Sequence, residues 1–209
     1  MITIIDSGIA NIASVTSAFR RLGAASRVTR EPSELENAHA IVLPGVGAFA
    51  DGMDSLRKCA LVTPIKQAAA RGTPILGICL GMQLLADASE EFGEHAGLGL
   101  VPGRVVQLQP GTTSERVPNI GWCDVEHREG SRLFAGTPAG RAFYFVHSFH
   151  MRCADEKDVS ASITFGGVSV TAAVERGNVL GVQFHPEKSQ DAGLGVMENF
   201  MRMAKEALS

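Results

Sequence analysis

Short apolar runs alternate with helical patterns through the first half of the chain, and this alternation limits the fold more than any other feature. Four apolar runs predict buried strands, at Ile2–Asp6, Ser26–Arg30, Ala40–Leu43 and Ile75–Ile78. Helical patterns predict helices at Asn11–Leu22, at Leu80–Ala88 and at Asp51–Arg71, the last with a break near Pro64. Strands that alternate with helices pair in parallel through right-handed crossovers. We therefore expect an open parallel sheet with helices on both faces.

The second half of the chain is richer in strand patterns. Six strands are predicted there, at Arg104–Leu108, Cys123–Glu126, Ala142–Val146, Ala161–Phe165, Val168–Val174 and Val179–Phe184. Turn residues at Gly166-Gly167 and Arg176-Gly177-Asn178 predict hairpins, and a closing helix is expected at Asp191–Leu208. The predicted fold class is therefore α/β, with three layers: a largely parallel central sheet flanked by helices, with antiparallel strand additions.

Size and composition fit one ordinary globular domain. The chain has 209 residues, of which 45% are hydrophobic and 20% charged. The segment Pro110–Pro118 is the most loop-like, but nothing in it marks a domain boundary. We expect residues 1–209 to form a single domain.

Charge and hydropathy disfavour several classes of partner. Acidic residues (22) outnumber basic residues (19), so there is no electrostatic case for binding nucleic acid or an anionic membrane. No apolar stretch approaches the roughly 18 residues of a membrane span, and Met1–Asp6 lacks the basic start of a signal peptide. The four cysteines show no C-x-x-C spacing, which disfavours a zinc site or a redox pair. We expect a cytoplasmic protein without a metal.

Cys79 directly follows the predicted strand Ile75–Ile78 and stands in the segment Gly77-Ile78-Cys79-Leu80-Gly81. Strand, small-residue turn and helix in this order are typical of a nucleophile elbow, here with sulfur in place of oxygen. The partial positive charge of a helix N-terminus favours the thiolate, which is the nucleophilic form. The alternative is structural, because a cysteine after a strand is often a small buried apolar residue.

His185 and Glu187 offer a base and a carboxylate far downstream of Cys79. In an extended segment residues i and i+2 point to the same side, and Pro186 favours an extended conformation at His185. Glu187 is then placed to orient the imidazole, as the third group orients the base beside an activated nucleophile. The alternative is a loop histidine next to a solvated glutamate.

Pro44-Gly45-Val46-Gly47 follows the third predicted strand and ends at the same sheet edge as Cys79. In isolation this segment is typical of a tight turn, and it lacks the spacing of a phosphate-binding loop. Beside a nucleophile, its glycines free the backbone to direct N–H groups toward an oxyanion.

Taken together, these segments resemble the class I (triad) glutamine amidotransferases, and among them the glutaminase subunits of imidazole glycerol phosphate synthase. The resemblance extends over nearly the whole chain. It rests on five segments, Pro44–Gly47, Gly77–Gln83, Val117–Trp122, Tyr144–Ser148 and Gly181–Ser189.

The resemblance implies hydrolysis of glutamine to glutamate and ammonia through a thioester on Cys79, with His185 and Glu187 completing the triad and no cofactor. It further implies that the N–H groups of Val46 and Leu80 hold the oxyanion. The residues expected to position glutamine are Gly47, Gln83, Ser148 and Phe149. Ammonia would pass to a (βα)₈-barrel cyclase subunit, the expected partner in a heterodimer of histidine biosynthesis.

Several residues depart from the family pattern, namely Ser7, Ala10, Asn119, Cys123 and Phe149. Two other functions stay open at this point: a glutaminase feeding another synthase, such as pyridoxal 5′-phosphate synthase, and a catalytically silent regulatory subunit. Trp122 and Tyr144 are either core residues or residues of a partner-facing surface. His147 is interpreted as structural or as a neighbour of the glutamine site.

Overall fold

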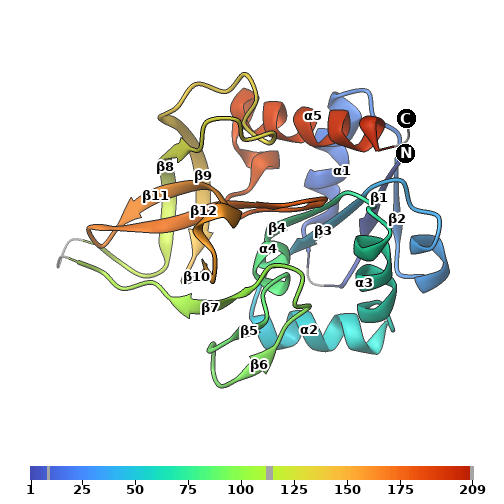
Figure 1. The fold of residues 1–209 in the computed structure, drawn as a ribbon, viewed down its shortest axis with the longest axis horizontal. Coiled ribbons are helices and arrows are strands. Elements are labelled where there is room, and N and C mark those ends of the chain that lie inside the picture. Colours follow the sequence, from blue (N-terminus) through green and yellow to red (C-terminus); the bar gives the residue numbers. More distant parts are fainter. Residues whose placement is uncertain (9, 112–114, 208–209) are drawn as a thin grey trace.

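The structure is a computed structural model that describes residues 1–8, 10–111 and 115–207. Within these residues nine strands form one large sheet in the order β2-β1-β3-β4-β13-β12-β11-β8-β9 (Figure 1). In chain order these strands are β1 (Ile2–Ile5), β2 (Ser26–Thr29), β3 (Ile41–Gly45), β4 (Ile75–Cys79), β8 (Asn119–His127), β9 (Arg141–His147), β11 (Val159–Phe165), β12 (Val168–Arg176) and β13 (Val179–Val182).

The large sheet is parallel in one half and antiparallel in the other. From β2 through β1, β3 and β4 to β13 every pairing is parallel. From β13 through β12, β11 and β8 to β9 every pairing is antiparallel. Both predicted hairpins are confirmed, since Phe165 pairs with Val168 and Arg176 with Val179. The predicted fold class is confirmed.

Helices cover both faces of the sheet (Figure 1). Helices α1 (Ile12–Arg21) and α5 (Gln190–Glu206) lie on one face, whereas α2 (Phe49–Lys58), α3 (Val62–Ala70) and α4 (Leu80–Leu84) lie on the other. Successive side chains of a strand enter opposite layers, so Ile4 packs with the α1 and α5 side chains and Ile5 with those of α2 and α3. None of the helices within the described residues combines the length and apolar character needed to cross a membrane.

A second, smaller sheet beside α2 and α4 was not predicted. Within the described residues it has four strands in the order β10-β7-β5-β6. They are β5 (Ala88–Ser89), β6 (His95–Ala96), β7 (Gly103–Gln107) and β10 (Phe149–Cys153). Only β7 matches a predicted strand. The two-residue strands are too short to carry a pattern, and the polar residues His150 and Arg152 obscured β10.

The helix predicted from Leu80 to Ala88 is wrong at its C-terminal end, because α4 stops at Leu84. The carbonyl groups that a longer helix would use accept hydrogen bonds from the following segment instead: Leu98 N bonds Leu84 O at 2.9 Å and Leu100 N bonds Leu85 O at 2.8 Å. Tertiary hydrogen bonds therefore ended the helix before its apolar pattern did.

Two other boundaries differ from the predictions. The break expected near Pro64 lies at Cys59–Leu61, and Pro64 sits in the first turn of α3, where proline is tolerated. Strand β8 begins at Asn119 rather than Cys123. Helix α5 is confirmed over its described length, but its predicted last residue, Leu208, lies outside the described residues.

Candidate active site

Cys79 occupies a strained turn between β4 and α4. It is the last residue of β4, its φ and ψ are 54° and −113°, and Leu80 begins the helix. A positive φ is costly for a residue with a side chain and marks positions held by their surroundings. The side chain is nearly buried, with an exposed fraction of 7%. The structure thus forms the strand–turn–helix geometry that the sequence predicted.

Glycines allow the backbone around Cys79 to pack without room for a side chain. A Cβ atom on Gly81 would lie 1.7 Å from the carbonyl oxygen of Leu43 in β3. A Cβ atom on Gly77 would lie 2.6 Å from the carbonyl oxygen of Gly81. Strands β3 and β4 and helix α4 therefore meet at backbone contact distance, and this contact sets the position of the turn.

His185 and Glu187 form the pair that the sequence predicted. His185 is extended, with φ −98° and ψ 96°, and its Nδ1 lies 2.9 Å from Glu187 Oε1. Both side chains are almost fully buried, with exposed fractions of 4% and 1%. His185 lines the cavity described below, whereas Glu187 is not among its lining residues. A buried carboxylate on Nδ1 leaves Nε2 as the nitrogen that faces the chemistry.

The pKa of His185 is set by opposing effects. Burial lowers this pKa. The Cys79 thiol and the Glu187 carboxylate beside the ring raise it by more than burial lowers it, so the pKa of His185 is raised to about 9. The imidazole therefore holds a proton at neutral pH while it lies next to the sulfur. This charge favours the thiolate of a neighbouring cysteine.

The chain around His185 is attached to strand β9 by hydrogen bonds. His185 N donates to Tyr144 O at 2.9 Å, and the Ser189 hydroxyl donates to His185 O at 2.7 Å. The same hydroxyl accepts from Tyr144 N at 2.9 Å. His185 is thereby attached to the antiparallel half of the sheet, whereas Cys79 lies on the parallel half.

A cavity of about 250 Å³ opens between these two halves. Eight of the nine site residues named from the sequence line it: Val46, Gly47, Cys79, Leu80, Gln83, Ser148, Phe149 and His185. The ninth, Glu187, does not line the cavity but contacts Nδ1 of His185. Segments from four separate parts of the chain thus meet at one cavity.

Glu91, which was not predicted from the sequence, also lines this cavity. Its Oε2 accepts from Phe49 N at 2.6 Å, at the start of helix α2. A carboxylate at a helix N-terminus is favoured electrostatically. The only signal in the sequence was the acidic pair Glu90-Glu91, which in isolation is typical of a solvated loop.

His147 lines the cavity, which agrees with its interpretation as a neighbour of the glutamine site. Its Nδ1 lies 2.8 Å from Phe149 O, an acceptor, so Nδ1 carries the proton. Its Nε2 then accepts from the Asn119 amide at 3.2 Å. Burial lowers the pKa of His147 to about 4, so the ring is neutral and satisfied as a structural group.

The remaining cysteines lie away from the described cavity lining. All are free thiols, and Cys59, Cys123 and Cys153 are half-buried. Burial raises the pKa of Cys153 to about 12 and also raises that of Cys123. The raised pKa values of Cys123 and Cys153 keep these two thiols protonated, which makes them poor nucleophiles.

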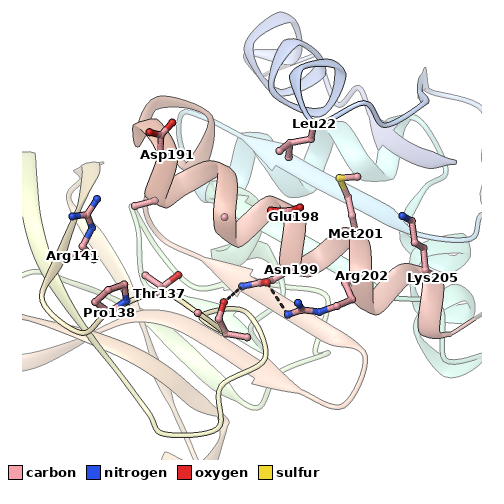
Figure 2. A pocket seen from close by; sticks show the side chains of 14 residues that line it. Leu22, Thr137, Pro138, Arg141, Asp191, Glu198, Asn199, Met201, Arg202 and Lys205 are labelled. Atoms are coloured by element: carbon pink, nitrogen blue, oxygen red, sulfur yellow. Dashed lines mark hydrogen bonds between the residues drawn. The ribbon is translucent and has the colours of Figure 1, made fainter.

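A larger cavity of about 810 Å³ lies beside helix α5 (Figure 2). Asn199 spans its floor, donating to Ala135 O at 2.9 Å and accepting from Arg202 at 2.8 Å. None of the nine candidate site residues named from the sequence lines this cavity. Its volume therefore does not mark the chemical site.

Comparisons with known proteins agree with this geometry. The family model "Glutamine amidotransferase class-I" matches residues 3–204. A relative from Sulfurimonas denitrificans, named imidazole glycerol phosphate synthase subunit HisH, is 46% identical over 204 residues, covering 97% of this chain and 98% of its own. A relative of the same name from Moorella thermoacetica is 46% identical over 206 residues, covering 99% and 96%.

Solved structures share the fold at low sequence identity. One, described as a glutamine amidotransferase, has a TM-score of 0.76 at 21% identity and covers 98% of this chain and 100% of its own. The structure of PurLQS from Thermotoga maritima has a TM-score of 0.75 at 20% identity, covering 96% and 97%. The chain belongs to the class-I glutamine amidotransferases and, within them, to the family of imidazole glycerol phosphate synthase subunits HisH.

Proposed function

We propose that this protein hydrolyses glutamine to glutamate and ammonia, with Cys79 as nucleophile, His185 as base and Glu187 as the group that orients the base. The observation that carries the proposal is the convergence of Cys79, His185 and the Pro44–Gly47 turn on one cavity of about 250 Å³. The buried Glu187–His185 contact of 2.9 Å adds the third member of the triad.

In the proposed reaction the Cys79 thiol has already given its proton to His185, and the resulting thiolate attacks the carboxamide carbon of glutamine. The N–H groups of Val46 and Leu80 stabilise the oxyanion of the tetrahedral intermediate. When the C–N bond breaks, His185 returns the proton to the nitrogen, which leaves as ammonia. His185 then takes a proton from water as the water attacks the thioester, and returns it to the sulfur as glutamate leaves.

The remaining cavity residues position glutamine in this proposal. Gly47, Gln83, Ser148 and Phe149 contact the substrate, and the Glu91 carboxylate receives its α-ammonium group. A half-buried carboxylate suits a cation better than a second carboxylate, so Glu91 also fixes the direction in which glutamine enters. No step of the proposed reaction requires a metal or a cofactor.

The proposed partner is a (βα)₈-barrel cyclase subunit, which uses the ammonia to make imidazole glycerol phosphate in histidine biosynthesis. The names of the relatives as synthase subunits support a partner in general. Exposed apolar side chains on β8 support a contact surface beside the base: Ile120 is 62% exposed and Trp122 49% exposed. Trp122 is thus no core residue, and it meets Tyr144 edge-on with ring centroids 6.0 Å apart.

Two alternative functions, a glutaminase subunit of another synthase and a catalytically silent regulatory subunit, have less support than the proposed function. The relatives share one synthase name, and the triad positions are intact. We also propose that the protein works in the cytoplasm, where its four free thiols remain reduced.

The test uses the complex with cyclase and compares glutamine with ammonium salts as nitrogen source. Cys79→Ala should abolish glutamine-dependent synthesis and leave ammonia-dependent synthesis intact, because only the hydrolysis uses the thiol. Cys59→Ala is the matched control and should keep both activities. Retained glutamine hydrolysis in a folded Cys79→Ala variant would refute the proposed function.

A further inference from the structure

The amide of Gln183 lies against the candidate nucleophile and has no role in the mechanism above. Gln183 follows strand β13 and is fully buried. Its Nε2 lies 3.8 Å from Cys79 Sγ, within the range of an N–H···S hydrogen bond. Its Oε1 lies 3.0 Å from Nε2 of Gln83 in helix α4. The two glutamines therefore connect the sulfur to the far side of the cavity.

The orientation of Gln83 follows from a backbone carbonyl. Phe149 O cannot donate, so the Gln83 atom 2.9 Å from it must be the nitrogen. The same nitrogen lies 3.0 Å from Gln183. An amide nitrogen has two hydrogens, and both are used by these two contacts.

The orientation of Gln183 then follows from that of Gln83. Because Gln83 presents a donor, the facing atom of Gln183 must be its oxygen. The nitrogen of Gln183 is left to face the Cys79 sulfur. A carbonyl in β10 thus determines, through two side chains, that the Gln183 group facing the sulfur is an N–H and not an oxygen; separately, the Cys79 thiol donates to Val146 O at 3.9 Å.

We propose that Gln183 is a positioning residue that donates an N–H to the Cys79 sulfur and so favours the thiolate, and that Gln83 sets the orientation of this donor. A hydrogen bond to a charged acceptor is about twice as strong as one between neutral groups, so the thiolate gains more from the donor than the thiol does. The inference rests on the proposed role of Cys79 as nucleophile.

The same geometry limits how Gln83 binds glutamine. With both N–H groups committed to Phe149 O and Gln183 Oε1, only its oxygen is free to meet the substrate. Gln83 therefore acts as an acceptor in the cavity. The part of glutamine that it contacts must carry a donor.

The experiment measures alkylation of Cys79 by iodoacetamide in the full-length protein without glutamine, from about pH 5 to about pH 10, with Cys79 followed by peptide mass spectrometry. Gln183→Met keeps the length of the side chain and removes the donor. We expect alkylation near neutral pH to slow by about tenfold, with rates that converge with wild type at high pH, where the thiol is ionised in both.

Gln83→Glu tests the second half of the proposal and remains available if Gln183→Met does not fold. A carboxylate at position 83 accepts rather than donates, so the Gln183 amide should turn over and place its oxygen on the sulfur. The alkylation profile should again move to higher pH. Gln67→Glu, on the exposed side of α3, makes the same chemical change elsewhere and should leave the profile in place.

Profiles that coincide with wild type in both variants would overturn the proposal. A loss of rate that persists at high pH would also overturn it, because that result indicates altered access rather than altered ionisation. A shift in Gln183→Met without one in Gln83→Glu would refute the role of Gln83 alone. Alkylation does not depend on turnover, so these outcomes are distinguishable from failure of the proposed glutaminase function.

Discussion

The two walls of the cavity beside Cys79 and His185 are held in place by different means. The wall that carries Cys79 is held by backbone packing, since Gly77 and Gly81 bring β3, β4 and α4 into direct contact. The opposite wall, at the ends of β9 and β13, is held by side-chain hydrogen bonds from Ser189 and His147. We infer that the first wall tolerates no added atom, whereas the second responds to pH and charge.

The second wall itself contains an instructive pair. His147 and His185 are both buried, yet burial lowers the pKa of His147 to about 4 while that of His185 is raised to about 9. His185 faces a carboxylate and a thiol, whereas His147 faces a carbonyl and an amide donor. Burial lowers the pKa of both rings, and only at His185 do the neighbouring carboxylate and thiol outweigh that effect.

The largest effect is expected from adding one methyl group to the packed wall. Gly81→Ala places a Cβ 1.7 Å from Leu43 O, so β3 and α4 must separate. We expect a loss of more than about 4 kcal/mol in the free energy of unfolding, measured by denaturant titration. Gly195→Ala in helix α5, where a Cβ meets nothing within 4 Å, is the matched control and should stabilise the protein by up to about 1 kcal/mol. Equal stabilities would show that the wall is not close-packed.

The next largest effect concerns turnover and distinguishes the contribution of His185 from that of Glu187. His185→Ala should reduce glutamine hydrolysis by at least about 10³-fold, because the proton has no carrier. Glu187→Gln should cost only about 10- to 100-fold, since an amide oxygen still accepts from Nδ1 but does not stabilise the cation. Steady-state glutamine hydrolysis measures both variants. A Glu187→Gln loss as large as that of His185→Ala would mean that the carboxylate does more than orient and stabilise the ring.

The difference between the walls also explains which parts of the site the sequence predicted. Cys79, Gly81 and the Pro44–Gly47 turn are local features, because glycines and an adjacent strand and helix are visible within a few residues. His185 and Glu187 are equally local, as neighbours in one extended segment. The fold class followed in the same way from alternating patterns.

The contacts that the sequence did not predict all join distant segments. Glu91 meets Phe49, and Gln183 meets Gln83 across 100 positions. The small sheet pairs β7 with β10, which are also remote in sequence. Such pairings depend on how the elements pack, and no local pattern of residues records them. The early end of α4 has the same origin, because its last carbonyl groups bond to Leu98 and Leu100.

The two histidines should give opposite pH dependences of stability. From pH 6.5 to about 9 the folded state keeps a proton on His185 that the unfolded state has lost, so stability falls as pH rises. From pH 6.5 down to about 4 the unfolded state holds a proton on His147, whereas His147 stays neutral in the folded state. Stability therefore falls as pH falls through this range. Each slope approaches about 1.4 kcal/mol per pH unit.

Variants assign these slopes to their residues. His185→Gln should flatten the alkaline slope and His147→Gln the acid slope, relative to wild type, in denaturant titrations across the pH range. The effect should be specific to each arm. If His147→Gln changed the alkaline arm instead, the assignment of neutral and charged rings to the two positions would be reversed.

The smallest effect tests whether the hydrogen-bond partner of His147 adds to burial in keeping its ring neutral. Asn119 donates to His147 Nε2 at 3.2 Å, which suits a neutral ring. In Asn119→Asp a carboxylate replaces the donor, so the ring gains stability only when protonated. We expect a loss of about 1 kcal/mol near neutral pH and a weaker acid slope than in wild type. Asn119→Ala, which removes the donor without adding charge, should keep the acid slope. An acid slope of the same size in Asn119→Asp as in wild type would show that burial, and not the partner, keeps His147 neutral.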